Sequence, residues 1–294
     1  MGLVPSQSNH ALGLKRDYVD VDTPVRLEVE HAIAWVTLNR PDSLNAMNGG
    51  LMDGLHDALC AAAEDPGVRC VVVRGEGRSF CSGGDVGMMA ERRQQAAEAP
   101  SLGALLDLQH RELERRSQAV TLLYTMPKPT LAVLHGHVVG GGLGVALAAD
   151  LRIAAVGTRL RVQFSRVGLS GDYGISYFLS QLLGGAKSRE LLLLDPEVDT
   201  DEATRLGLLT AVYPAEELAG AAEALARRLA DGPTIAYGRM KDNLRAAATH
   251  SLEEVLRLEA MNQRFSANAA VVRSNDGSSG DGFHADGSHS GGTP

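Results

Sequence analysis

Two glycine-rich segments and one isolated carboxylate are the parts of this chain best suited to chemistry. The segments FCSGGDV (80–86) and HGHVVGGGLGVALAAD (135–150) each place glycines directly after a strand-like apolar run. Glycine lets a backbone N–H approach a ligand oxygen closely, since no Cβ stands in the way. Gly141 lies at the entrance of an expected helix, where unpaired N–H groups favour negative charge. Two such loops can hold a developing oxyanion between two N–H donors, each contributing about 3–4 kcal/mol of transition-state stabilisation.

The isolated carboxylate is Asp172, in the segment GLSGDYGISYFL (168–179). The residues alone leave two interpretations open. Aspartate is a favoured helix N-cap, and the run that follows is typical of a helix start, where Ser170 is able to share the capping role. The alternative is proton transfer, for which a single positioned carboxylate suffices.

Several other kinds of site are not indicated. Neither glycine segment matches a dinucleotide-binding or phosphate-binding loop. The three cysteines lack metal-type spacing and are expected to be reduced thiols of a cytoplasmic protein (Cys60, Cys70 and Cys81). His284 and His289 fall in a Gly/Ser-rich tail and are interpreted as solvated side chains. We expect no metal ion.

Composition narrows the class of protein further. The chain has 294 residues, 44% of them apolar, which is enough for a sizeable core. Its net charge of −8 and its 4% aromatic residues argue against nucleic acid as a partner. No apolar run approaches the roughly 18 residues of a membrane-spanning helix, so no membrane partner is expected.

The elements that must position these residues follow an α/β pattern. Strand-like runs, small-residue loops and helical runs alternate along the first two-thirds of the chain, which predicts a layered core with parallel strands. Asn48 is the expected cap of an early helix, and residues 88–126 have a charged, helical composition. We predict a flexible arm, a core, a helical region and a disordered Gly/Ser-rich tail, at residues 1–24, 25–200, 201–272 and 273–294.

Four segments together resemble the crotonase family, the enoyl-CoA hydratases and isomerases. They are VTLNRPDSLNAMN, RSFCSGGDV, KPTLAVLHGHVVGGGLGVALAADLRIA and ATRLGLLTAVYPAEEL, and the similarity runs from about residue 25 to 270. The resemblance implies an α/β fold, a crotonase-like spiral of ββα repeats with a helical C-terminal trimerisation region. It also implies a homotrimer or hexamer that binds acyl-CoA thioesters, with coenzyme A as part of the substrate and no other cofactor.

The resemblance also assigns roles to residues. It implies that the N–H groups of Gly84 and Gly141 stabilise the oxyanion. The residues expected to contact substrate or coenzyme A are Ser82, Gly83, Gly84, Asp85, Val86, Gly140, Gly141, Phe164 and Tyr173. Many relatives carry a lysine where this chain has Gly87, so Arg239 or Lys241 are candidates to hold the CoA phosphates.

A few nearby residues have simpler expectations. Tyr177 is expected to pack, whereas Tyr173 is open between packing and substrate contact. His135 and His137 are interpreted as structural, although His137 is close enough in sequence to line the acyl pocket. The runs ERRQQ and RELERR are interpreted most simply as solvated helix faces, with one of their arginines as a candidate to lie near a CoA phosphate.

The chain lacks the pair of acidic residues that is typical of the hydratases in this family. Family hydratases hold water between two glutamates, and those positions are Gly144 and Phe164 here. The segment VQFSRVGLSGDYG (162–174) resembles ring-type enoyl-CoA isomerases, in which an aspartate at this place is the base. The leading hypothesis is therefore an enoyl-CoA isomerase that uses Asp172 alone. The alternatives are a hydratase lacking the usual glutamate pair and a catalytically inactive acyl-CoA-binding homologue.

Overall fold

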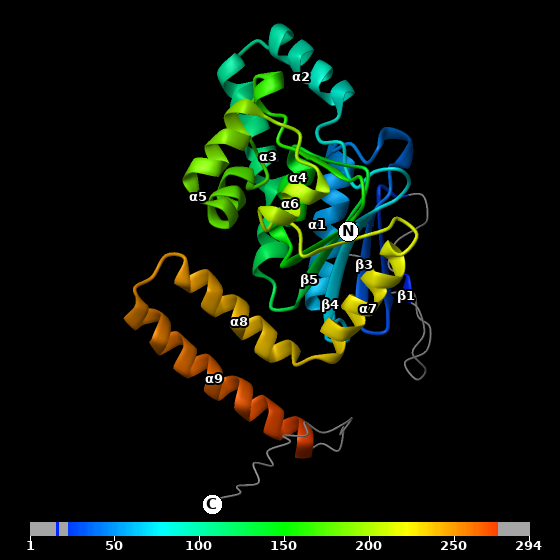
Figure 1. The fold of residues 1–294 in the computed structure, drawn as a ribbon. Helices are drawn as coiled ribbons and strands as arrows, with labels where there is room; N and C mark the ends of the chain where they lie inside the picture. Colours follow the sequence, from blue (N-terminus) through cyan, green and yellow to red (C-terminus); the bar gives the residue numbers. More distant parts are fainter. Residues whose placement is uncertain (1–15, 18–22, 276–294) are drawn as a thin grey trace, which may run out of the picture. The chain divides into compact units, whose positions relative to one another are not determined.

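The computed structural model describes residues 16–17 and 23–275 of the chain (Figure 1). The chain separates into two compact units, Met1–Lys241 and Asp242–Pro294, which divide within one helix. The expected arm and tail lie mostly outside the described residues. The domain boundaries drawn from the sequence stay predictions.

The first unit is built on a seven-stranded sheet in the order β1-β2-β3-β4-β5-β7-β9. Its first pairs are antiparallel, and every pair from β3 onward is parallel. The predicted parallel α/β core is therefore confirmed. The strands are β1 Arg16–Asp17, β2 Val25–Glu30, β3 Ile33–Leu38, β4 Cys70–Gly75, β5 Thr130–Leu134, β7 Leu151–Ala155 and β9 Ala211–Tyr213.

A second, smaller layer of strands lies beside the main sheet. Strand β6 (His137–Val139) pairs in parallel with β8 (Arg159–Arg161). Single bridges extend this layer, joining Cys81 to Val138 and Leu160 to Val198. Chain segments thus run repeatedly from a main-sheet strand into the small layer and then into a helix, as in β5, β6 and α4 (Gly141–Ala148). This is the predicted spiral of ββα repeats.

The strands of the main sheet bury both faces. Val71 and Val73 of β4 belong to a core formed with α1 (Gly49–Glu64), α3 (Leu102–Thr125), α4 and α5 (Ile175–Leu194). Cys70 and Val72 of the same strand belong to a second core, under α7 (Leu218–Asp231). Successive side chains of a strand point to opposite faces, so an uninterrupted apolar run serves both cores.

The remaining elements of the first unit are shorter or peripheral. They are η1 Pro41–Ser43, α2 Val86–Glu98, η2 Ser165–Val167 and α6 Thr200–Arg205. Asn48 caps α1 as predicted, since its side chain accepts a hydrogen bond from the N–H of Leu51. The charged stretch 88–126 forms α2 and α3, which confirms the expectation that it is helical.

Helix α8 (Thr234–Ala247) crosses from one unit to the other, and α9 (Leu252–Asn275) belongs to the second. Within the second unit, the side chain of Asn262 donates a hydrogen bond to that of Asn243. Apolar side chains of this unit are exposed, among them Leu244, Leu252, Leu256 and Met261.

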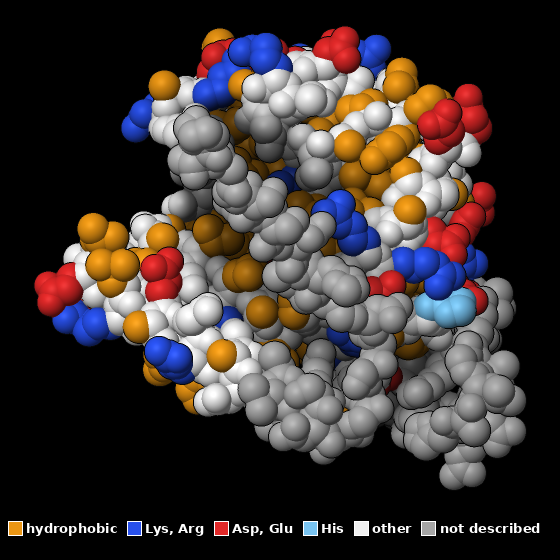
Figure 2. Space-filling model, turned by 60° about the horizontal axis from the view of Figure 1, so that its bottom comes forward, with side chains coloured by type: hydrophobic (Ala, Val, Ile, Leu, Met, Phe, Trp, Pro, Cys, Tyr) orange, Lys and Arg blue, Asp and Glu red, His pale blue; other side chains and the backbone are white. Residues whose placement is uncertain are grey.

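Acidic and basic side chains are interspersed on the face that Figure 2 shows. No helix among the described residues is long and apolar enough to cross a membrane. Within residues 16–17 and 23–275, no three His, Cys, Asp or Glu side chains are arranged to hold a metal ion.

Candidate active site

The small layer of strands brings the two glycine loops together. The N–H of Cys81 donates to the carbonyl of His137 at 3.0 Å, and the N–H of Val139 donates to the carbonyl of Cys81 at 3.0 Å. Directly after this ladder the chain enters Gly83 on one side and Gly140 on the other. Both loops therefore emerge at the same edge of the layer.

Close contact between the loops explains why they are glycine-rich. Gly83 has φ +89°, and a Cβ there would lie 3.1 Å from the carbonyl oxygen of Val139. Gly140 has φ +56°, and a Cβ there would lie 3.7 Å from the Cα of Gly83. Any side chain at Gly83 would be both strained and crowded, so glycine is required there.

The candidate oxyanion donors are held by their neighbours in the chain. Met47 donates its N–H to Gly83 at 2.7 Å and accepts one from Asp85 at 3.1 Å, so a short bridge fixes Gly84 between them. Gly141 is the first residue of α4, where a helix leaves its N–H groups unpaired. No described residue accepts a hydrogen bond from the N–H of Gly84 or of Gly141.

A cavity of about 390 Å³ opens beside these two amides. Most of the site residues expected from the sequence line it, namely Ser82, Gly83, Gly84, Gly140, Gly141, Phe164, Asp172 and Tyr173. Asp85 is not part of the lining. Val86 begins α2, and its side chain lies outside the described part of the structure.

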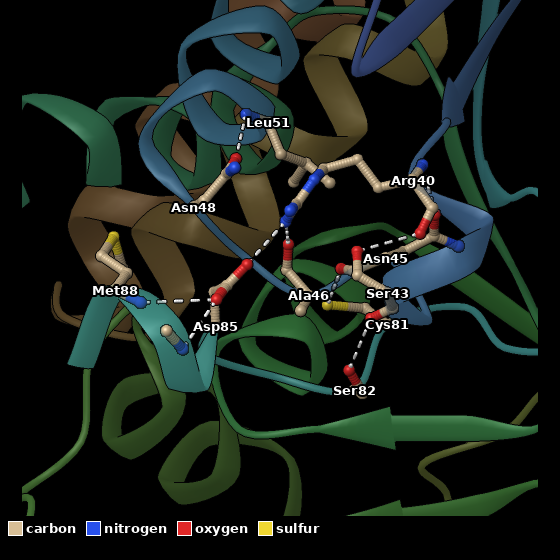
Figure 3. A network of polar contacts seen from close by, with 11 residues as sticks. Arg40, Ser43, Asn45, Ala46, Asn48, Leu51, Cys81, Ser82, Asp85 and Met88 are labelled. Atoms are coloured by element: carbon tan, nitrogen blue, oxygen red, sulfur yellow. Dashed lines mark hydrogen bonds and ion pairs between the residues drawn. The ribbon is translucent and has the colours of Figure 1, made fainter. Parts of the chain in front are cut away.

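Asp85 instead organises the first loop, as Figure 3 shows. Its carboxylate pairs with Nη1 of Arg40 at 3.0 Å and accepts N–H groups of Gly87 and Met88, which caps α2. Burial raises the pKa of Asp85, but the hydrogen bonds from Arg40, Met88 and Gly87 together outweigh burial, and the pKa lies below its ordinary value. Arg40 also donates to the carbonyl of Ala46.

Asn45 is a second organising residue that the sequence reasoning missed. It is fully buried with φ +55°, and its side chain donates to the carbonyls of Glu76 and Ser79 at 2.9 and 2.8 Å. The Asn45 backbone carbonyl accepts a hydrogen bond from the Cys81 thiol. Burial raises the pKa of that thiol to about 12, so Cys81 is not a nucleophile. Both Arg40 and Asn45 lie in the motif NRPDSLN (39–45), which is part of the family resemblance and could have pointed to them.

The backbone around Asp172 has an unusual conformation. Gly171, Tyr173 and Gly174 have φ values of +105°, +46° and +76°. Helix α5 begins at Ile175 with Gly174 as its N-cap, and no side chain caps it. The capping interpretation of Asp172 is therefore wrong, because the turn places its carboxylate two residues before the cap. The side chain lines the cavity instead, and its Oδ1 is buried.

Gly144 and Phe164, the two positions that the family resemblance aligns with the glutamates of hydratases, are closed by this same segment and by an aromatic ring. A Cβ on Gly144 would lie 2.5 Å from the carbonyl oxygen of Tyr173, so the turn after Asp172 occupies the space that a longer side chain needs. Phe164 is 7% exposed and lines the cavity with its ring. Among the described residues that line the cavity, Asp172 is the single acid.

The structure also shows what the tyrosines and histidines near the site contact. Tyr173 is buried and packs over α4, since a Cβ on Gly141 would lie 2.5 Å from its ring. Tyr177 makes edge contacts with neighbouring rings, which confirms packing as its role. His135 bonds to a backbone carbonyl, and His137 is exposed; neither lines the cavity.

The structure corrects two expectations about basic residues. Lys241 is not available to coenzyme A, because it is buried and its Nζ is bound by Asp150 and by the carbonyl of Lys128. Arg116, from the run interpreted as a solvated face, lines the cavity with a side chain that is 15% exposed. Arg239 is half-buried.

Comparison with known proteins agrees with this geometry. Residues 28–280 match the family model described as enoyl-CoA hydratase/isomerase. The chain is 33% identical over 245 residues to 1,2-epoxyphenylacetyl-CoA isomerase of Escherichia coli K12, which covers 83% of this chain and 90% of that protein.

Solved structures share the fold. An enoyl-CoA hydratase from Polaromonas sp. JS666 superimposes with a TM-score of 0.76 at 28% identity, over 86% of this chain and 94% of that one. A protein from Thermobifida fusca YX, solved in complex with acetoacetyl-CoA, has a TM-score of 0.75 at 28% identity, over 84% and 95% of the two chains. The chain therefore belongs to the enoyl-CoA hydratase/isomerase family, the crotonases, and is an enzyme of that type.

Proposed function

We propose that this enzyme is an enoyl-CoA isomerase in which Asp172 moves the proton. The observation that carries the proposal is the cavity itself, where one carboxylate faces a space flanked by the two candidate amide donors. The space at Gly144 and Phe164, where a water-holding pair of acids would stand, is filled by Tyr173 and by the phenyl ring. One acid can carry out isomerisation, whereas hydration needs a positioned water as well.

The proposed reaction has two proton transfers. The carboxylate of Asp172 removes a proton from C2 of a 3-enoyl thioester, and the C2–H electron pair forms the enolate. The N–H groups of Gly84 and Gly141 stabilise the negative charge on the thioester oxygen. The carboxylic acid so formed returns the proton to C4, the double bond moves to C2–C3, and Asp172 is again ionised. Atoms and charge balance without any cofactor.

An acyl-CoA substrate is supported from two directions. A structural relative was solved with acetoacetyl-CoA, and a sequence relative is named for a CoA thioester of an aromatic acid. The cavity is bordered by Ser82 and Gly83, which the family resemblance assigns to the coenzyme path. Three free cysteines fit the reducing cytoplasm, where we propose that the enzyme works.

The direct test is incubation of the purified protein with matched 2-enoyl-CoA and 3-enoyl-CoA thioesters, followed by mass and ultraviolet absorbance. Isomerisation leaves the mass unchanged and interconverts the two pools. In deuterated water some of the product should keep its original hydrogen, because a single carboxylate carries it from C2 to C4. A 3-hydroxyacyl-CoA product would establish the hydratase alternative, and binding without turnover would establish the inactive one.

We also propose that three or six chains assemble. The exposed side chains of Leu244, Leu252, Leu256 and Met261 in the second unit would be buried in such an assembly, which is favourable at roughly 25 cal/mol per Å². Light scattering at micromolar concentration tests this, and a monomeric particle would contradict it.

A further inference from the structure

We propose that the acyl part of the substrate carries a neutral oxygen acceptor, such as a hydroxyl, ketone or ether, that Gln109 and Arg116 of α3 bind. The inference rests on the proposed function, since it concerns the substrate of that same cavity. It names a feature of the acyl group that the isomerase chemistry does not require.

The first argument comes from the inward stripe of α3. Residues 109, 113, 116, 120 and 123 follow at intervals of four, three, four and three, so they share one face of the helix. At its C-terminal end this stripe is apolar, and Val120 and Leu123 are buried in the core. Toward the N-terminal end the same stripe reaches the cavity, and there it carries Gln109 and Arg116 around Leu113. Packing alone would be served by apolar residues at all five positions.

The second argument is the state of the Gln109 amide. Its Nε2 is buried, and none of the described residues accepts a hydrogen bond from it. Buried amide donors are nearly always satisfied, because leaving one without an acceptor costs free energy. The side chain lines the cavity, so an oxygen atom of a bound ligand is an acceptor within its reach.

The third argument is the position of the Arg116 guanidinium. Its ion pairs with Asp53 and Glu112 are 3.5 Å long, which exceeds hydrogen-bonding distance, so its N–H groups keep donor capacity. It lies against the start of α1, where a Cβ on Gly49 would be 2.7 Å from Nη2. Glycine at that position is what leaves room for the guanidinium.

Charge decides which kind of oxygen fits. Asp53 and Glu112 already balance the positive charge of Arg116, and Asp172 lines the same cavity. A carboxylate on the acyl group would meet three acids and two neighbouring cations, Arg115 and Arg116. A neutral oxygen can accept hydrogen bonds from both Gln109 and Arg116 without repulsion from these carboxylates. The other lining side chains from residues 162–169 are largely apolar, which suits the carbon frame of the acyl group.

The test measures binding without turnover. Saturated acyl-CoA thioesters of equal length, with and without a hydroxyl or keto oxygen at successive carbons, are titrated by calorimetry into the wild-type protein and into Gln109→Leu. At one oxygen position the wild type should bind the oxygenated thioester about 10-fold or more tightly than the hydrocarbon. Gln109→Leu should lose that preference and keep its affinity for the hydrocarbon. A carboxylated probe should bind more weakly than the neutral one.

Gln118→Leu is the matched control, because Gln118 is exposed on the same helix. It should leave the preference intact. Thermal unfolding adds an independent measurement, since removal of a buried unsatisfied amide should leave the Tm of Gln109→Leu unchanged or raise it.

The outcomes separate this inference from the proposed function. Equal binding of oxygenated and hydrocarbon thioesters at every position would overturn the inference and leave the isomerase proposal intact. A preference for oxygen that depends on Gln109 would support it, even in a protein that showed no isomerase turnover. Failure to bind any acyl-CoA would overturn both.

Discussion

Asp85 and Asp172 are two aspartates that each precede a helix, and they differ in what surrounds them: Asp172 lines the cavity and Asp85 does not. Asp85 is the N-cap of α2, and its carboxylate is bound by Arg40 and by two backbone N–H groups. Asp172 precedes α5 by a turn of left-handed residues, so a glycine takes the capping position.

The difference shows that the backbone conformation before a helix decides what an aspartate side chain contacts. Where the chain enters the helix directly, the carboxylate reaches the first N–H groups and becomes structural. Where Gly171, Tyr173 and Gly174 bend the chain first, the carboxylate is directed to the cavity and the tyrosine closes the space at Gly144. A conformation with three positive φ values costs free energy for Tyr173, and such strain is common at functional sites.

The sharpest way to break this comparison is to neutralise the cavity acid. Asp172→Asn keeps the size of the side chain and removes the base, so kcat should fall by roughly 10² to 10⁴. Unfolding in denaturant should change little, because the helix does not depend on this side chain. Asp107→Asn, at an exposed position on α3, is the control and should keep full turnover. Normal turnover of Asp172→Asn would remove the aspartate from the mechanism.

The amide donors can be tested with a pair of variants at one position. Gly141→Pro removes the N–H and also adds atoms near Tyr173 and Met47, whereas Gly141→Ala adds a comparable steric load and keeps the N–H. Turnover of the proline variant should be lower than that of the alanine variant by about 100-fold, the scale for loss of one oxyanion donor. Equal turnover of the two variants would contradict the assignment.

The closure of the first glutamate position gives a stability prediction. Gly144→Ala places a Cβ 2.5 Å from the carbonyl of Tyr173, so the turn behind Asp172 must shift. The free energy of unfolding should fall by about 1–3 kcal/mol, as for other overpacked sites. Gly103→Ala is the comparison, because no atom lies within 4 Å of that Cβ, and it should be neutral or slightly stabilising. Equal stability of the two variants would mean that the space at Gly144 is open.

The smallest expected effect concerns the structural aspartate. Asp85→Ala should lower the free energy of unfolding at neutral pH by about 1 kcal/mol through loss of the cap. The pKa of Asp85 is lowered in the folded state, so its ionised form stabilises the protein above about pH 4, and this contribution is lost as the pH falls through the folded pKa. The gap between wild type and variant should therefore shrink in acid, and a gap that is constant with pH would contradict the ion pair.

Much of the scaffold could be predicted from short-range patterns. The cap at Asn48 and the helix that begins at Gly141 both formed as expected, because each depends on nearby residues. Arg116 was misplaced on a solvated face, since a charged residue on a helix gives no sign of which neighbour covers it. The site residues Arg40 and Asn45 were missed for a similar reason, because their partners lie about 30 to 45 residues away.

By itself the sequence determined the alternating strands and helices of a parallel α/β core and the two glycine loops, which follow from hydrophobic period and from the absence of a Cβ, both local properties. The ββα spiral and the loss of the glutamate pair were implied by the resemblance to the crotonase family. Only the tertiary structure decided that Asp172 lines the cavity and does not cap α5, because the two placements differ by a turn of a few left-handed residues. It also decided that Gln109 and Arg116 share the cavity with Asp172, since α3 reaches that space through packing against α1 and α4. Long-range contacts of this kind are set by how whole elements fill a common core, which no short stretch of sequence specifies.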